Sequence, residues 1–142
     1  VGRDAYREAA TQVFVTGSFW YSGAPMAAAI ATITELHRID GPALMRAAGQ
    51  RWRDGLAEQA ARHGFEIDQS GPPAMPLLQF VGDKDSKLGE AFCQETLRRG
   101  VFMHHKHNMF LGTAHDADVI DCALDATEAA FASLAKNRET NE

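Results

Sequence analysis

A short polar loop rich in glycine and hydroxyl side chains is the part of this chain best suited to hold an anion. It contains Thr16, Gly17 and Ser18, and then Ser22-Gly23 directly before an alanine-rich segment. Hydroxyls and free backbone N–H groups near a helix N-terminus are the donors that bind phosphate. From this pattern alone, an ordinary polar helix entry is the simpler interpretation. Three adjacent aromatic residues, Phe19-Trp20-Tyr21, indicate that the loop also lines an interface or a pocket.

Histidines form the second candidate group. The run His104-His105-Lys106-His107 is followed by His115, and His105 and His107 would share one face of a strand. Metal sites in proteins usually combine such histidines with acidic or cysteine ligands at short fixed spacings, and no such partner is present here. We therefore expect a solvated turn and no metal site, with a metal-dependent enzyme kept as an alternative.

Alternating helical and extended patterns must position these groups. The apolar spacing and the Pro and Gly punctuation predict four main helices and a short N-terminal one. The expected helices span residues 3–10, 25–37, 42–63, 86–99 and 117–135, and the expected short strands span 13–15, 65–67, 75–81, 101–103 and 109–111. The pattern predicts helix caps at Asp40, at Asp85 or Ser86, and at Asp116. It predicts that the polar tail from Lys136 frays. The order of the elements predicts a small α+β domain with a sheet covered on one side by helices.

Composition limits the classes of function. The chain has 142 residues, 45% of them hydrophobic and 23% charged, and a net charge of −5, which fits one small globular domain or a segment of a larger one. The acidic balance argues against a nucleic-acid partner, and no apolar run approaches the roughly 18 residues of a membrane span. No signal peptide is visible, so we expect a cytoplasmic protein whose Cys93 and Cys122 are buried free thiols.

Several segments, in their order along the chain, are similar to one enzyme family. These are Val1–Asp4, Ser18-Phe19-Trp20 followed by Ala27–Ile33, then Phe80–Asp83, Glu95–Phe102 and Ala114-His115. Together they resemble the C-terminal part of class III aminotransferases, pyridoxal-phosphate enzymes of fold type I, in the glutamate-1-semialdehyde 2,1-aminomutase-like subgroup. The resemblance covers essentially the whole chain. Gly23-Ala24-Pro25 departs from the Gly-Asn-Pro that is common in the family.

The resemblance implies an α/β fold, with the end of the large pyridoxal-phosphate domain over residues 1–40 and a small α+β domain over 41–142. Residues 1–40 would carry the phosphate loop and an interdomain helix. Ser18 stands where the family has a threonine that contacts the cofactor phosphate of the neighbouring subunit, so a homodimer follows. Gly17, Phe19 and Trp20 would lie beside the cofactor, and His105 and His107 near the substrate entrance, where an imidazole would meet a substrate carboxylate.

The implied activity is transfer of an amino group between an amine donor and a carbonyl acceptor, by an aminotransferase or an aminomutase, on small amino and keto substrates. The family's Schiff-base lysine lies upstream, and Lys84, Lys87, Lys106 and Lys136 stand in polar surroundings that would not activate a nucleophile. We therefore expect no catalytic residue in this segment and no transamination by it alone. The alternative is a stand-alone α+β binding domain without catalysis, which the apolar segment Ala27–Ile33 disfavours.

Overall fold

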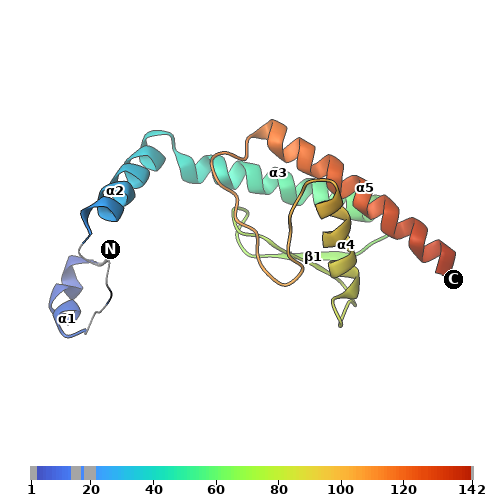
Figure 1. Ribbon diagram of the computed structural model, residues 1–142, viewed down its shortest axis with the longest axis horizontal. Helices are drawn as coiled ribbons and strands as arrows, with labels where there is room; N and C mark the ends of the chain where they lie inside the picture. The colour runs from blue at the N-terminus through green and yellow to red at the C-terminus, as the bar shows by residue number, and fades with distance from the viewer. Residues whose placement is uncertain (1–2, 14–16, 18–21, 142) are drawn as a thin grey trace. The chain divides into compact units, whose positions relative to one another are not determined.

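A computed structural model describes residues 3–13, 17 and 22–141 of the chain (Figure 1). The chain divides into two compact units, Val1–Arg38 and Ile39–Glu142. The predicted strand over residues 13–15 lies almost entirely outside the described residues.

The first unit consists of a one-turn helix η1 (Asp4–Tyr6), helix α1 (Arg7–Thr11) and helix α2 (Gly23–Arg38). The predicted N-terminal helix and the alanine-rich helix are therefore confirmed, with Pro25 in the first turn of α2. None of the residues of α2 is buried, and Met26, Ile30 and Ile33 on its apolar side are 48–67% exposed. This helix thus presents an apolar surface that its own unit does not cover.

The second unit packs three helices and a two-stranded sheet around one core. Helix α3 (Gly41–Arg62) lies along α5 (Ala117–Asn141), and α4 (Lys87–Arg98) packs on α5. Strands β1 (Ile67–Ser70) and β2 (Leu77–Phe80) are antiparallel, with Ile67 opposite Phe80, and contact α3 and α4 (Figure 1). An aromatic cluster forms the centre of the core: Phe65, Phe80, Phe92 and Phe131, with neighbouring ring centroids 4.5–5.9 Å apart.

Of the predicted strands, one is confirmed in shortened form, one is displaced and two are absent from the described residues. β2 lies within the predicted strand 75–81, whereas β1 begins at Ile67, where the predicted strand 65–67 ends. Residues 101–103 and 109–111 have no regular secondary structure. The Met109 N–H donates to the Pro76 carbonyl and the Leu111 N–H to that of Ala74, at 2.8 and 2.9 Å. These two hydrogen bonds attach residues 109–111 to the residues before β2, but they do not make a strand of them.

The helix caps follow the predictions in part. Asp116 caps α5, because its Oδ1 accepts from the Val119 N–H at 3.0 Å. Asp40 and Ser86 occupy the N-cap positions of α3 and α4, but both adopt left-handed backbone with φ of 50° and 58°, and neither side chain caps its helix. Asp83 caps α4 instead.

The Asp83 carboxylate accepts from the Leu88 and Gly89 N–H groups at 3.2 and 2.8 Å. Both donors belong to the first turn of α4 and would otherwise lack a partner. Asp83 lies four residues before the first residue of α4, so a search of the N-cap position in the sequence does not identify it as the cap. Short-range spacing therefore predicted the helix and its start but assigned the cap to the wrong residue.

Two further expectations are wrong. Helix α5 continues to Asn141, so the tail from Lys136 is helical. Both cysteines are free, but Cys93 is half-buried and Cys122 is exposed. Burial raises the pKa of the Cys93 thiol to about 11. Within the described ranges, no helix is both long enough and apolar enough to cross a bilayer.

Candidate functional site

The predicted phosphate loop is described only at its edges. Ser18, Phe19 and Trp20 lie outside the described residues, so their roles remain predictions. Gly17 has a φ of 155°, a conformation that glycine adopts easily. At the start of α2, a side chain added to Gly23 would meet no atom within 4 Å. Gly23, the first residue of α2, thus has free space around its Cα.

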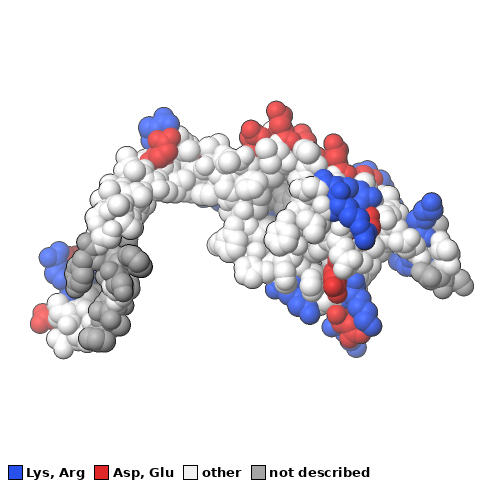
Figure 2. Space-filling view, in the orientation of Figure 1, with Lys and Arg blue, Asp and Glu red and all other residues white. Residues whose placement is uncertain are grey.

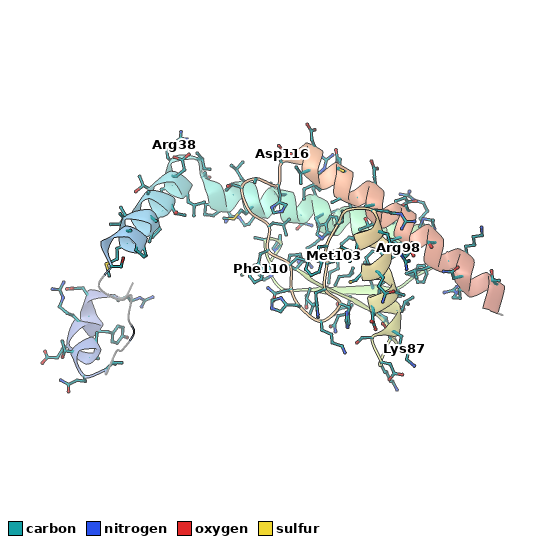
Figure 3. All side chains as sticks on the ribbon, in the orientation of Figure 1. Arg38, Lys87, Arg98, Met103, Phe110 and Asp116 are labelled. Atoms are coloured by element: carbon teal, nitrogen blue, oxygen red, sulfur yellow. The ribbon has the colours of Figure 1, made fainter. Side chains whose placement is uncertain are left out.

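A cavity of about 550 Å³ opens in the second unit, beside the histidine turn. Its walls come from α3, from α5 and from the extended segment between α4 and α5, on which Figure 3 labels Met103 and Phe110. This volume lies within the range of small-molecule sites, about 300–1,000 Å³. The lining residues are Trp52, Val101, Phe102, Met103, His104, His107, Asn108, Met109, Phe110, Leu111, His115, Val119, Ile120 and Ala123.

The structure separates the two histidines that the sequence placed together. His107 lines the cavity and His105 does not. The ring of His105 stacks on that of His104, with centroids 4.8 Å apart, and its Cβ would lie 3.2 Å from a Cβ added to Gly89 on α4. The turn is compact rather than a strand, so neighbouring side chains do not alternate between two faces. Of the two candidate substrate-contact residues, only His107 faces the cavity.

Hydrogen bonds indicate which nitrogen carries a proton in the neutral rings of His107 and His115, two of the three histidines that line the cavity. The Nδ1 of His107 lies 2.8 Å from the Asn108 carbonyl oxygen, which can only accept, so Nδ1 is the donor and Nε2 is a free acceptor. The Nδ1 of His115 lies 2.8 Å from the Gly112 N–H and 3.3 Å from the Gly112 carbonyl oxygen, and the shorter contact favours Nδ1 as the acceptor, with Nε2–H as a donor.

Besides His104, His107 and His115, the described lining consists of Asn108 and of apolar side chains. No lysine, arginine, aspartate or glutamate is among the described residues that line the cavity. In the space-filling view, mostly uncharged atoms cover the segment between α4 and α5, while charged side chains gather along α5 and at the start of α4 (Figure 2). In the described part of the chain, no group of three histidine, cysteine or acidic side chains is placed to hold a metal ion.

The sequence did not lead us to expect Trp52, Phe102 and Phe110 as parts of this site. Trp52 is only 3% exposed, as a core residue is, yet it also forms part of the cavity wall. Its Nε1 is buried and has no hydrogen-bond acceptor among the described residues. Phe102 and Phe110 are 77% and 62% exposed. Two large aromatic residues in matching positions on either side of the histidine turn were the available signal.

Comparison with known proteins identifies relatives that match most of this chain. No protein-family model matches the chain. It is 41% identical over 137 residues to an aminopentol aminotransferase of Sphingopyxis macrogoltabida, covering 96% of this chain and 32% of that protein. It is 31% identical over 134 residues to a glutamate-1-semialdehyde 2,1-aminomutase of Desulfosudis oleivorans, covering 86% of this chain and 31% of the relative.

A solved structure gives the same result. The structure of the PLP internal aldimine form of Sphingopyxis sp. MTA144 FumI protein superposes with a TM-score of 0.90 at 40% identity, covering 98% of this chain and 34% of that one. This chain therefore spans about a third of the length of the proteins it matches. The predicted resemblance and fold are confirmed: the chain is similar to the C-terminal part of pyridoxal-phosphate-dependent aminotransferases and of glutamate-1-semialdehyde aminomutases, and it shares their fold type I.

Proposed function

We propose that the protein containing this chain transfers an amino group between an amine donor and a carbonyl acceptor. The observation that carries this proposal is the match of the whole chain, at 40% identity and a TM-score of 0.90, to a pyridoxal-phosphate enzyme. Pyridoxal phosphate, when bound, supplies the electron sink and carries the amino group. The higher identity to an aminotransferase, 41% against 31% for an aminomutase, favours intermolecular transfer over isomerisation.

The residues of this chain would contribute to binding rather than to bond breaking. Ser18 would donate its hydroxyl to the cofactor phosphate, with Gly17 giving close backbone approach and Phe19 and Trp20 beside the cofactor. The position of this loop directly before α2 supports this assignment, since a helix N-terminus favours an anion.

The contact with phosphate would be made to the neighbouring subunit of a homodimer. Two-fold symmetry makes such a contact reciprocal, so each subunit would complete the other's site. The exposed Met26, Ile30 and Ile33 on α2 support this, because an apolar stripe of this kind is normally covered. We also propose residues 1–40 as the end of the large domain and 41–142 as the small domain. Two free thiols support a cytoplasmic location.

The first experiment is the visible absorbance spectrum of the full-length protein with added pyridoxal phosphate. An absorbance band of the protein-bound cofactor that is bleached by an amine donor is expected. No band in the wild-type protein would contradict the cofactor assignment itself.

The role of Ser18 is tested by replacing its hydroxyl. Ser18→Ala is expected to weaken cofactor binding roughly 10- to 100-fold, the usual worth of a hydrogen bond to a charged group. Ser22→Ala, in the same loop, is the matched control and is expected to bind the cofactor normally. Equal affinities in the two variants would contradict the assignment of Ser18.

His107 would contact a polar group of the substrate from the cavity wall. A neutral ring offers Nε2 as an acceptor, which suits a hydroxyl or ammonium group, whereas only the protonated ring carries the charge that suits a carboxylate. His107→Ala is expected to raise the KM of the amino substrate, and His105→Ala, on the same turn but outside the cavity, is the control. An unchanged KM in His107→Ala would remove the proposed contact.

A further inference from the structure

The outer edge of β1 carries backbone groups that point away from its partner strand. Among the described residues the sheet has two strands, so β1 pairs with β2 on one side. The Val81 N–H donates to the Glu66 carbonyl at 2.9 Å, which makes these residues a hydrogen-bonded pair next to the antiparallel ladder. Because backbone groups alternate in direction along a strand, those of Ile67 and Gln69 point outward. An edge of this kind is a template for pairing with another strand.

Arg53 of α3 occupies this edge in the place of a further strand. Its guanidinium donates to the Gln69 carbonyl at 2.7 Å and to the Gly71 carbonyl at 2.9 Å. These carbonyls lie two residues apart, the spacing at which a neighbouring strand would offer its N–H donors. The Gln69 side chain returns a bond from its Nε2 to the Arg53 carbonyl at 2.8 Å. Arg53 therefore covers two acceptors of the edge and attaches β1 to α3.

Asp68 gives the same edge a second protection. Two copies of one strand pair about a two-fold axis, and an axis at Asp68 keeps both hydrogen-bonded pairs within β1, each joining Ile67 of one copy to Gln69 of the other. An axis at Gln69 would use Gly71, whose φ of 81° is not extended. The axis at Asp68 places two exposed carboxylates directly opposite each other. Like charges in that position are unfavourable.

We propose that the outer edge of β1 is a pairing surface for β1 of a second copy of this protein, and that Arg53 and Asp68 keep it closed. Arg53 holds the carbonyls that the second strand would need, and Asp68 repels its own counterpart. Neither residue is among those that line the cavity of the second unit. Association through this edge can therefore be measured apart from amino-group transfer.

Light scattering by the full-length protein, over a range of concentrations, measures the closure. The average mass of Arg53→Ala is expected to rise with concentration, while the wild-type protein keeps the mass of its native assembly. Arg51→Ala removes an exposed arginine from the same helix and breaks its bonds to Asp121, so it is the matched control and should behave as the wild type. Asp68→Asn added to Arg53→Ala should strengthen association about two- to fivefold, the usual worth of a cross-strand pair.

A disulfide locates the pairing. In a Cys122→Ser background, Asp68→Cys combined with Arg53→Ala places two thiols at a non-hydrogen-bonded pair, where Cα atoms lie about 4.5 Å apart and can be bridged. Oxidation with copper–phenanthroline is expected to link two copies. Ser70→Cys, exposed on the same strand, is the control. About the axis at residue 68, two such cysteines lie four residues apart, about 13 Å along the strand, which is too far for a disulfide.

Three results would overturn the proposal. The first is an unchanged mass in both Arg53→Ala and its combination with Asp68→Asn, as when another part of the protein covers the edge. The second is equal cross-linking of the Asp68→Cys and Ser70→Cys variants, which is also the result that aggregation of a misfolded variant would give. The third concerns Arg53→Lys, which keeps the charge but loses the forked donor. With the circular dichroism of the wild type, it should associate to an extent between the wild type and Arg53→Ala, and a wild-type mass would contradict the role of the two carbonyl bonds.

Discussion

Gly49 on α3 is the position where the smallest change should have the largest effect on the fold. It is buried, and a Cβ built there would lie 1.9 Å from the Pro73 carbonyl oxygen and 2.4 Å from its carbonyl carbon. Real Cβ atoms essentially never come closer than 3.0 Å to such atoms. Gly49→Ala therefore forces α3 and the backbone before β2 apart by more than about 1 Å.

The expected cost follows from two opposing effects. Alanine stabilises a helix interior by about 0.5–1 kcal/mol relative to glycine. Overpacking a well-filled site costs about 1–3 kcal/mol, and the upper end applies because the obstacle is backbone rather than a side chain. We expect a net loss of about 2 kcal/mol in the free energy of unfolding. The displaced backbone also holds the cavity wall, since the Ala74 carbonyl accepts from the Leu111 N–H.

Urea unfolding of the chain, followed by the fluorescence of buried Trp52 in a Trp20→Phe background, measures this loss. With an m-value of about 2 kcal/mol per molar urea, the midpoint should fall by about 1 M. Gly55→Ala is the matched control on the same helix. Its Cβ would meet the terminal methyls of Leu124 at 2.6 and 2.7 Å, and such a side chain can move. If Gly49→Ala proved as stable as Gly55→Ala, the reasoning from the close approach would be wrong.

Three further predictions concern single side chains. Asp83→Asn keeps the size of the α4 cap but removes its charge, so thermal unfolding should show a loss of about 0.5–1 kcal/mol, and an unchanged Tm would contradict the capping role. Exposed Cys122 should react with a thiol reagent at neutral pH well before Cys93, whose pKa is raised to about 11 by burial; equal rates would contradict this. The Arg99 guanidinium, bonded to Glu95 at 2.6 Å, lowers the pKa of that carboxyl. The stabilising contribution of ionised Glu95 is therefore present above the ordinary carboxyl pKa and is lost as the pH falls through the lower folded-state value. Arg99→Gln should reduce the acid sensitivity of unfolding, which a pH series of urea midpoints would measure.

The helices could be predicted from the sequence because their signals are local. Apolar residues recur at helical spacing in α3 to α5, and Gly64 and Gly100 end two of these helices with φ of 72° and 88°. The family, too, could be recognised from the order of its motifs, and the comparisons confirm it. The prediction of the helices depends on residues that are close together in the chain, and the recognition of the family depends on the order of the motifs.

The sheet and the cavity depended on contacts between distant segments. The position of β1 is set by pairing with β2, Ile67 opposite Phe80, and no local pattern determines that register. Cys122 belongs to a helical pattern but lies on the outward side of α5, since only the packing of α3 and α4 decides which side is covered.

The cavity shows the same division most clearly. The sequence displays the histidine turn and its flanking phenylalanines, but Trp52 and Val119 reach them only because α3 and α5 pack side by side. The chain itself determined its helices and its family, because short-range spacing encodes both. Tertiary packing decided which histidines line the cavity, because a site built from three separate segments exists only once the core has formed.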